Sequence, residues 1–106
     1  MTTKPPIAVT MGDPSGIGPE IAVKALASND VPITIYGNLK ILEITAEKLG
    51  LELASKKVVN TINLTPDQIS SIKYSIPSKL TGKIAYSAIE SAVDDCLNNN
   101  LSALVT

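Results

Sequence analysis

The residues best suited to chemistry lie in one short segment, residues 12–20, with the sequence GDPSGIGPE. Its three glycines allow the backbone to turn sharply and to approach a ligand closely. A helix that begins at Pro19 would direct free N–H groups and a positive dipole end toward an anion or a polar cofactor. Asp13 and Glu20 add carboxylates that could accept hydrogen bonds from hydroxyl groups. The segment fits a ligand-binding loop, and a plain strand-to-helix turn explains the same residues about equally well.

Two common nucleotide-binding motifs are excluded by spacing. The dinucleotide fingerprint G-x-G-x-x-G does not fit glycines at positions 12, 16 and 18. A phosphate-binding loop needs G-x-x-x-x-G-K-[ST], and the chain has a single Gly-Lys pair, at positions 82 and 83. Pro77 stands where the first glycine of that motif should be, and Ile84 stands where Ser or Thr should be.

The chain contains no histidine, which excludes Ser-His-Asp and Cys-His catalysis and histidine-based metal sites. Cys96 is the single cysteine, and we interpret it as a small apolar residue on a helix, because no base stands near it in the sequence. Lys24 and Lys83 could bind anions, but solvated helix lysines are the simpler interpretation. We therefore predict no catalytic residue and no metal ligand in these 106 residues.

The first half of the chain alternates between strand and helix signals. Residues 7–11 form an apolar run between Pro5-Pro6 and a glycine, which predicts a buried strand. Pro19 at a first helical position predicts a helix over about 19–28. Residues 32–36 predict a second strand, and Asn38 and Gly50 predict the cap and the stop of a second helix.

The second half has one strong helix signal. Residues 57–62 are consistent with a strand, and Pro66, Asp67 and Pro77 interrupt the rest of the stretch from 51 to 80. A helix is predicted over about 82–98, ended by Asn98-Asn99-Asn100, and residues 101–106 predict another strand. One apolar stripe on this helix consists of Ala85, Ala88, Ile89, Ala92, Val93 and Cys96.

This order of elements predicts an α/β protein with three layers and a mostly parallel sheet. The chain ends inside an apolar strand, and the loop that should follow this strand is where ligands of such sheets bind. We therefore expect residues 1–106 to be the N-terminal portion of a longer chain.

Composition narrows the function classes further. Hydrophobic residues make up 44% of the chain, which is enough for a folded core. The net charge is −1 with no basic block, so nucleic-acid binding is not expected. The apolar runs are too short to span a membrane, and the N-terminus lacks the features of a signal peptide. A cytoplasmic protein is expected.

Residues 10–21, TMGDPSGIGPEI, closely resemble the N-terminal signature of the 4-hydroxythreonine-4-phosphate dehydrogenases. The isocitrate and isopropylmalate dehydrogenases, whose fold is broadly similar, have a shorter version without the Pro-Ser pair. Two later segments look like further landmarks of the first family: residues 82–86, which open a helix, and the strand at 101–106.

The resemblance implies NAD- or NADP-dependent oxidation of 4-phosphohydroxy-L-threonine, followed by decarboxylation, on the pathway to pyridoxal 5′-phosphate. It implies a divalent metal such as Zn or Mg, held by three histidines from both subunits of a homodimer, in a cleft between two α/β domains. None of those histidines has a counterpart here. Residues 1–106 would then be the N-terminal part of one α/β domain of a larger two-domain enzyme, inactive by itself.

The residues that match the family signature are Gly12, Asp13, Gly16 and Gly18, and we predict that they shape the wall of the cleft near the cofactor. Asp13 is the best candidate for a polar contact with that cofactor. A turn-stabilising role beside Pro14 explains Asp13 at least as well.

Three alternatives stay open at this point. A sister enzyme of the same family would oxidise 4-phospho-D-threonate or 4-phospho-D-erythronate. A non-catalytic module would hold a phosphate or nucleotide at the loop of residues 12–18. A structural or dimerisation segment would pack the helix of residues 82–98 against a partner, although the apolar stripe of this helix could equally cover the sheet.

Overall fold

The computed structural model describes residues 6–28, 32–98, 101 and 103–105. The predicted boundaries at Pro5, Asn99 and Asn100 lie outside the described residues, as do Ser102 and Thr106 of the predicted last strand.

Four parallel strands form one sheet in the order β3-β2-β1-β4. β1 pairs on one side with β2, where Ile7 lies beside Ile33, and on the other side with β4, where Ile7 lies beside Ala103. β2 pairs in turn with β3. The four strands are β1 (Ile7–Thr10), β2 (Ile33–Gly37), β3 (Val58–Asn60) and β4 (Ala103–Val105).

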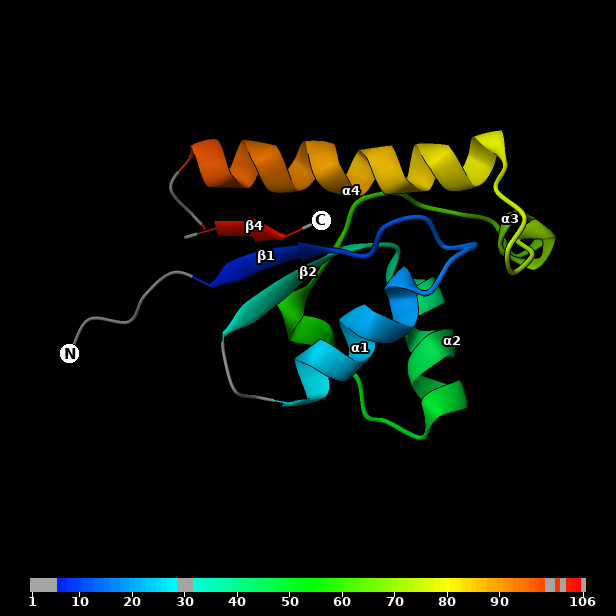
Figure 1. The fold of residues 1–106 in the computed structure, drawn as a ribbon, viewed down its shortest axis with the longest axis horizontal. Helices are drawn as coiled ribbons and strands as arrows, with labels where there is room; N and C mark the ends of the chain where they lie inside the picture. The colour runs from blue at the N-terminus through cyan, green and yellow to red at the C-terminus, as the bar shows by residue number, and fades with distance from the viewer. Residues whose placement is uncertain (1–5, 29–31, 99–100, 102, 106) are drawn as a thin grey trace.

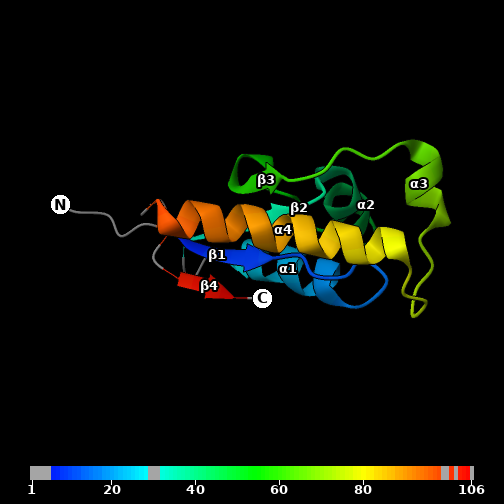
Figure 2. The ribbon, with the colours of Figure 1, turned by 90° about the horizontal axis from the view of Figure 1, so that it is seen from above.

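Helices cover both faces of this sheet, which confirms the predicted three-layer α/β class (Figure 1). α1 (Gly18–Ser28) and α2 (Leu39–Leu49) lie on one face, and α4 (Lys79–Leu97) lies on the other. The short helix α3 (Pro66–Ser71) lies beyond the N-terminal end of α4, and the 3₁₀ turn η1 (Ser55–Lys57) precedes β3 (Figures 1 and 2).

Buried apolar residues form two clusters, and Ile84 of α4 belongs to the larger one. Most of the larger cluster lies between the sheet and the helix pair α1 and α2, and this part includes Met11, Val23, Ile35 and Leu42, all at most 1% exposed. The smaller cluster lies under α4, where the alanines of this helix allow it to pack closely on the sheet.

The predicted ends of α2 are confirmed in atomic detail. Asn38 Oδ1 accepts a hydrogen bond from the Ile41 N–H at 2.9 Å, so the side chain caps the first turn. Gly50 adopts φ +67° and ψ +27°, the left-handed conformation that glycine tolerates without strain.

The prediction for residues 65–80 is wrong in two places. Pro66 does not interrupt structure but opens α3, because Thr65 and Gln68 form a capping box around the first turn. The helix predicted from Gly82 begins at Lys79, where Ser78 and Thr81 form a second capping box.

The predicted apolar stripe of the last helix is also partly wrong. The face on the sheet consists of Thr81, Ile84, Ala88 and Ala92, each 0% exposed. Ile89 and Val93, which the stripe included, are each 37% exposed on the outer side. Both faces carry apolar residues at helical spacing, so periodicity alone could not select the buried one.

None of the helices in the described part of the chain is long and apolar enough to cross a membrane.

Candidate ligand-binding loop

The glycine-rich loop lies where the strand order reverses. The chain leaves β1 toward β2 through α1 on one face of the sheet, and it reaches β4, on the other side of β1, through α4 on the opposite face. Open α/β sheets bind ligands beyond the carboxyl ends of their strands at such a reversal. The loop of residues 11–17 follows the carboxyl end of β1 directly, so its position suits ligand binding.

Each glycine of the loop meets a different constraint. Gly12 has φ +75°, which favours glycine over any residue with a side chain. Gly18 packs its Cα against the Met11 carbonyl so closely that a Cβ would overlap the oxygen. Gly16 is exposed, its N–H donates to the Asp13 carbonyl at 3.0 Å, and a Cβ there would meet only ordinary contact at 3.6 Å.

Asp13 stabilises the turn from within. Its Oδ1 accepts from the Ser15 N–H at 2.8 Å and from the Ser15 hydroxyl at 2.6 Å. Burial raises the pKa of Asp13, but the hydrogen bonds from Ser15 and the hydroxyl of Thr81 outweigh burial and hold the pKa below its usual value of 3.8. The carboxylate is thus kept charged, and the turn-stabilising interpretation of Asp13 has direct geometric support.

A distant segment holds the loop in place. Ser15 is 3% exposed, and its carbonyl accepts a hydrogen bond from the Ser75 N–H at 2.7 Å. Ser75 lies in a tight turn closed by the bridge between Lys73 and Ile76, with φ +66°. The loop is therefore fixed by contacts that form only when residues far apart in the sequence come together.

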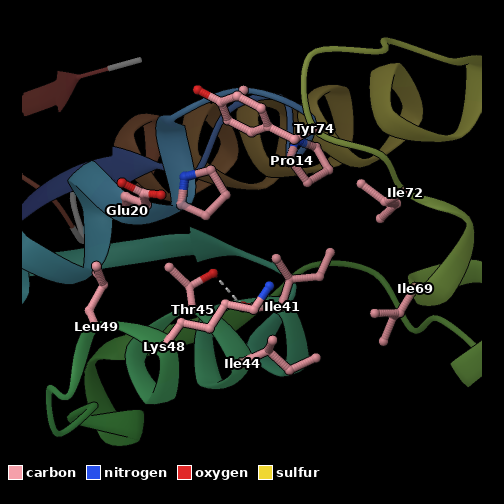
Figure 3. Close-up of a pocket in the computed structure, with 12 residues that line it drawn as sticks. Pro14, Glu20, Ile41, Ile44, Thr45, Lys48, Leu49, Ile69, Ile72 and Tyr74 are labelled. Carbon is pink, nitrogen blue, oxygen red and sulfur yellow. Dashed lines mark hydrogen bonds between the residues drawn. The ribbon is translucent and has the colours of Figure 1, made fainter.

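One side of the loop borders an open groove of about 240 Å³ (Figure 3). Its floor and walls are mainly apolar side chains, with Glu20 from α1 on one side and Thr45 and Lys48 from α2 on the other. The full lining is Pro14, Gly16, Pro19, Glu20, Ile41, Ile44, Thr45, Lys48, Leu49, Ile69, Ile72 and Tyr74.

The structure brings together only part of the predicted site. Gly16 lines the groove, whereas Gly12, Asp13 and Gly18 shape the loop beside it. Lys24 and Lys83 are exposed helix residues away from the groove, and Lys48 is the lysine that borders it. Sequence analysis missed Lys48, although its helical spacing from Thr45 and Ile41 places all three on one side of α2.

The resemblance implies a nicotinamide nucleotide and a divalent metal, and the described residues suit the first but not the second. A Cβ on Gly12 would meet nothing within 4 Å and one on Gly16 would meet only a carbonyl, so the bare backbone is open to the close approach of a nucleotide. Within the described ranges, no three side chains of His, Cys, Asp or Glu come close enough together to hold a metal ion. The donor set for a catalytic metal is therefore not assembled by these residues.

Known proteins similar to this chain include dehydrogenases named for small phosphorylated acids. No protein-family model matches the chain. The 4-hydroxythreonine-4-phosphate dehydrogenase of Sulfurihydrogenibium is 33% identical over 110 residues, which covers 94% of this chain and 34% of that enzyme. A candidate D-threonate 4-phosphate dehydrogenase of Fusobacterium nucleatum is 28% identical over 122 residues, covering 100% of this chain and 36% of its own length.

The crystal structure of a 4-hydroxythreonine-4-phosphate dehydrogenase from Burkholderia phymatum superposes with a TM-score of 0.76 and 26% identity. The match covers 97% of this chain and 36% of that one. The resemblance to the 4-hydroxythreonine-4-phosphate dehydrogenases is confirmed. The chain spans about a third of the length of these dehydrogenases, and it shares their fold over nearly all of its own length.

Proposed function

We propose that this chain is part of an NAD-dependent dehydrogenase that oxidises 4-phosphohydroxy-L-threonine, with decarboxylation, in the biosynthesis of pyridoxal 5′-phosphate. Residues 1–106 contribute a part of one α/β domain of a two-domain, homodimeric, cytoplasmic enzyme. The observation that carries the proposal is the position of the loop of residues 11–17 at the carboxyl end of β1, beside the reversal of strand order, in a chain similar to named phospho-acid dehydrogenases.

In this proposal the loop forms the cofactor side of the cleft. The exposed backbone at Gly16 and the open space at Gly12 let the nucleotide approach the main chain, and Gly18 secures the turn against Met11. Asp13 keeps a charged carboxylate at the rim by means of its hydrogen bonds from Ser15. In this proposal a divalent metal would be held by residues other than the described ones, among which no three His, Cys, Asp or Glu side chains come together.

A second candidate is oxidation of 4-phospho-D-threonate or 4-phospho-D-erythronate. The similarity to the Fusobacterium protein named for D-threonate 4-phosphate, which spans 100% of this chain, favours it. Both candidates share the oxidation of a hydroxyl group in a small phosphorylated acid, and they differ in the part of the substrate distant from the cofactor.

A hybrid enzyme tests the proposal. Residues 1–106 replace the matching third of the Sulfurihydrogenibium dehydrogenase, and NADH formation is followed with each phosphorylated acid in the presence of Zn²⁺ or Mg²⁺. We expect NADH to form with 4-phosphohydroxy-L-threonine and to be lost with Gly18→Ala. A folded hybrid that forms no NADH with any of the three acids would refute the proposal, and turnover of a phospho-sugar acid alone would select the second candidate.

A further inference from the structure

A strained turn lies beside the glycine-rich loop. Residues 73–76 form this turn, and the Ile76 N–H donates to the Lys73 carbonyl at 3.1 Å. Ser75, its third residue, has φ +66°, and among the described residues it is the one non-glycine residue with a positive φ. Turns with a positive φ at this position favour glycine, because a residue with a side chain is strained there. Such strain persists only where neighbouring contacts hold it, so the contacts of Ser75 indicate its role.

Ser75 is held by a hydrogen bond to the loop of residues 11–17. Its N–H donates to the Ser15 carbonyl at 2.7 Å, the short end of the usual range for N–H···O bonds. Ser15 is 3% exposed, so water has little access to this carbonyl if the turn moves away. Within the described part of the chain, this is the one backbone–backbone hydrogen bond that joins residues 12–16 to another segment. The position of the loop backbone therefore depends on the turn.

The chain that follows the turn contacts the loop a second time. Pro77 restricts Ile76 to an extended conformation, and Ser78 then opens α4 with its capping box. Thr81, which completes this box, is 0% exposed, and its hydroxyl helps to lower the pKa of Asp13 in the loop. One short stretch of chain thus acts on the loop at two points, and the start of α4 fixes the stretch itself.

The turn and the loop also line the same groove (Figure 3). Tyr74 of the turn, 69% exposed, lines it together with Pro14 and Gly16 of the loop. Because Tyr74 and Ser75 are neighbours in one turn, opening the turn would move the aromatic ring and release the Ser15 carbonyl together. A change of conformation at Ser75 should therefore reach the exposed backbone at Gly16.

We infer that Ser75 is a positioning residue of the cofactor site, whose strained turn fixes the exposed backbone of Gly16 through the Ser15 carbonyl. The inference rests on the proposed function, in which this backbone faces the nucleotide. Ser75 acts through the loop and not by contact with the cofactor, so it should affect the binding of NAD and not the binding of the phosphorylated acid.

Two substitutions at Ser75 separate the conformation of the turn from the serine hydroxyl. Ser75→Val should open the turn, because a β-branched residue strongly disfavours a positive φ. Ser75→Gly keeps the positive φ and the N–H, although it lacks the hydroxyl as well. In the hybrid enzyme we expect Ser75→Val to raise the KM for NAD severalfold, with kcat and the KM for the phosphorylated acid unchanged. Ser75→Gly should leave all three values unchanged.

Leu101→Ala is the control for a loss of stability alone. Leu101 is buried in the smaller cluster and precedes β4, at the end of the parallel sheet opposite the loop. Leu101→Ala should destabilise the hybrid without a change in the KM for NAD. An unchanged KM for NAD in Ser75→Val, or an equal rise in Leu101→Ala, would overturn the inference. Ser75→Thr has the same branch at Cβ and replaces Ser75→Val if that variant does not fold.

Amide hydrogen exchange of the hybrid without cofactor tests the contact independently of turnover. The N–H groups of Ser15 and Gly16 are bonded to Asp13. We expect both to exchange severalfold faster in Ser75→Val than in the unchanged hybrid, and at the unchanged rate in Ser75→Gly. Equal exchange in all three would overturn the inference even where the hybrid forms NADH. A hybrid that forms no NADH with any of the acids would instead refute the proposed function, and with it the cofactor role of Ser75, whatever the exchange rates.

Discussion

At the scale of single residues, the loop of residues 11–17 is specified by close backbone contact more than by side-chain chemistry. Its glycines could be identified from the sequence, but their separate roles could not. The role of Gly18 depends on the position of the Met11 carbonyl, and the exposure of Gly16 depends on the turn that Asp13 and Ser15 close. Lys48 was missed for a related reason, since the groove exists only once α1, α2 and the segment after α3 meet.

Three glycine-to-alanine variants should separate these roles. Gly18→Ala should lower the free energy of unfolding by about 1–3 kcal/mol or more, because the new Cβ overlaps the Met11 carbonyl and the backbone must shift. Gly16→Ala should have little effect on stability, since its Cβ meets only an atom at 3.6 Å. Gly82→Ala, in open space on α4, should stabilise by about 0.5–1 kcal/mol. Urea unfolding followed by circular dichroism measures all three, and equal stability of Gly18→Ala and Gly16→Ala would contradict the described packing.

The hydrogen bonds from Ser15 make a prediction about acid stability. The pKa of Asp13 is lower in the folded chain than its usual value of 3.8, so the charged carboxylate stabilises the fold above that pH. This contribution is lost as the pH falls through the folded-state pKa. Asp13→Asn keeps an acceptor for Ser15 but cannot titrate, so it should flatten the fall of the urea midpoint below about pH 4. An unchanged slope in Asp13→Asn would contradict the assignment.

At the scale of elements, the sequence was most informative about helix boundaries that a single residue determines. Asn38 and Gly50 bound α2 as predicted, because a side-chain cap and a left-handed glycine each act locally. The start of α4 and the whole of α3 were missed, because Pro66 was interpreted as a breaker, although Thr65 and Gln68 complete a capping box around it. The orientation of α4 was missed in part, since the choice between two apolar faces is made by packing on the sheet.

The cap of α2 provides a test at this scale. Asn38 is 3% exposed, and besides capping Ile41 it donates from Nδ2 to the Ile62 carbonyl at 2.9 Å. Asn38→Ala should therefore cost about 1–2 kcal/mol for the cap, plus the cost of the unpaired carbonyl. Asn38→Ser keeps a capping oxygen and loses only the link to Ile62, so it should be less destabilising by about 1 kcal/mol. Urea unfolding of the two variants and of the unchanged chain gives both differences in the free energy of unfolding. Equal losses in the two variants would show that the cap contributes little.

At the scale of the whole molecule, the fold class could be predicted because alternating strand and helix signals leave few arrangements. The order of the strands could not, since no local signal says on which side of β1 the strand β4 pairs. That order matters for function, because it sets the reversal beside which the loop of residues 11–17 lies.

The described sheet has an outer strand at each edge, β3 and β4, and the exposed edge at β4 predicts a weak fold for the 106-residue chain. β4 is an outer strand, with Ala103 exposed and Val105 54% exposed. We expect the chain to melt below ~45 °C, the lower limit for ordinary domains of this size. The same chain should form no NADH from 4-phosphohydroxy-L-threonine, because its described residues assemble no metal site. A cooperative melt at high temperature, or NADH formation above background, would contradict the respective prediction.

If the loop of residues 11–17 faces the cofactor, a change in its exposed backbone should alter the steady-state kinetics of the hybrid enzyme. The variant is Gly16→Ala, since the added methyl group blocks the exposed backbone without straining the fold, and Lys24→Ala is the control. We expect Gly16→Ala to raise the KM for NAD severalfold while the KM for the phosphorylated acid stays unchanged. An unchanged KM for NAD, or a rise confined to the KM for the phosphorylated acid, would contradict it.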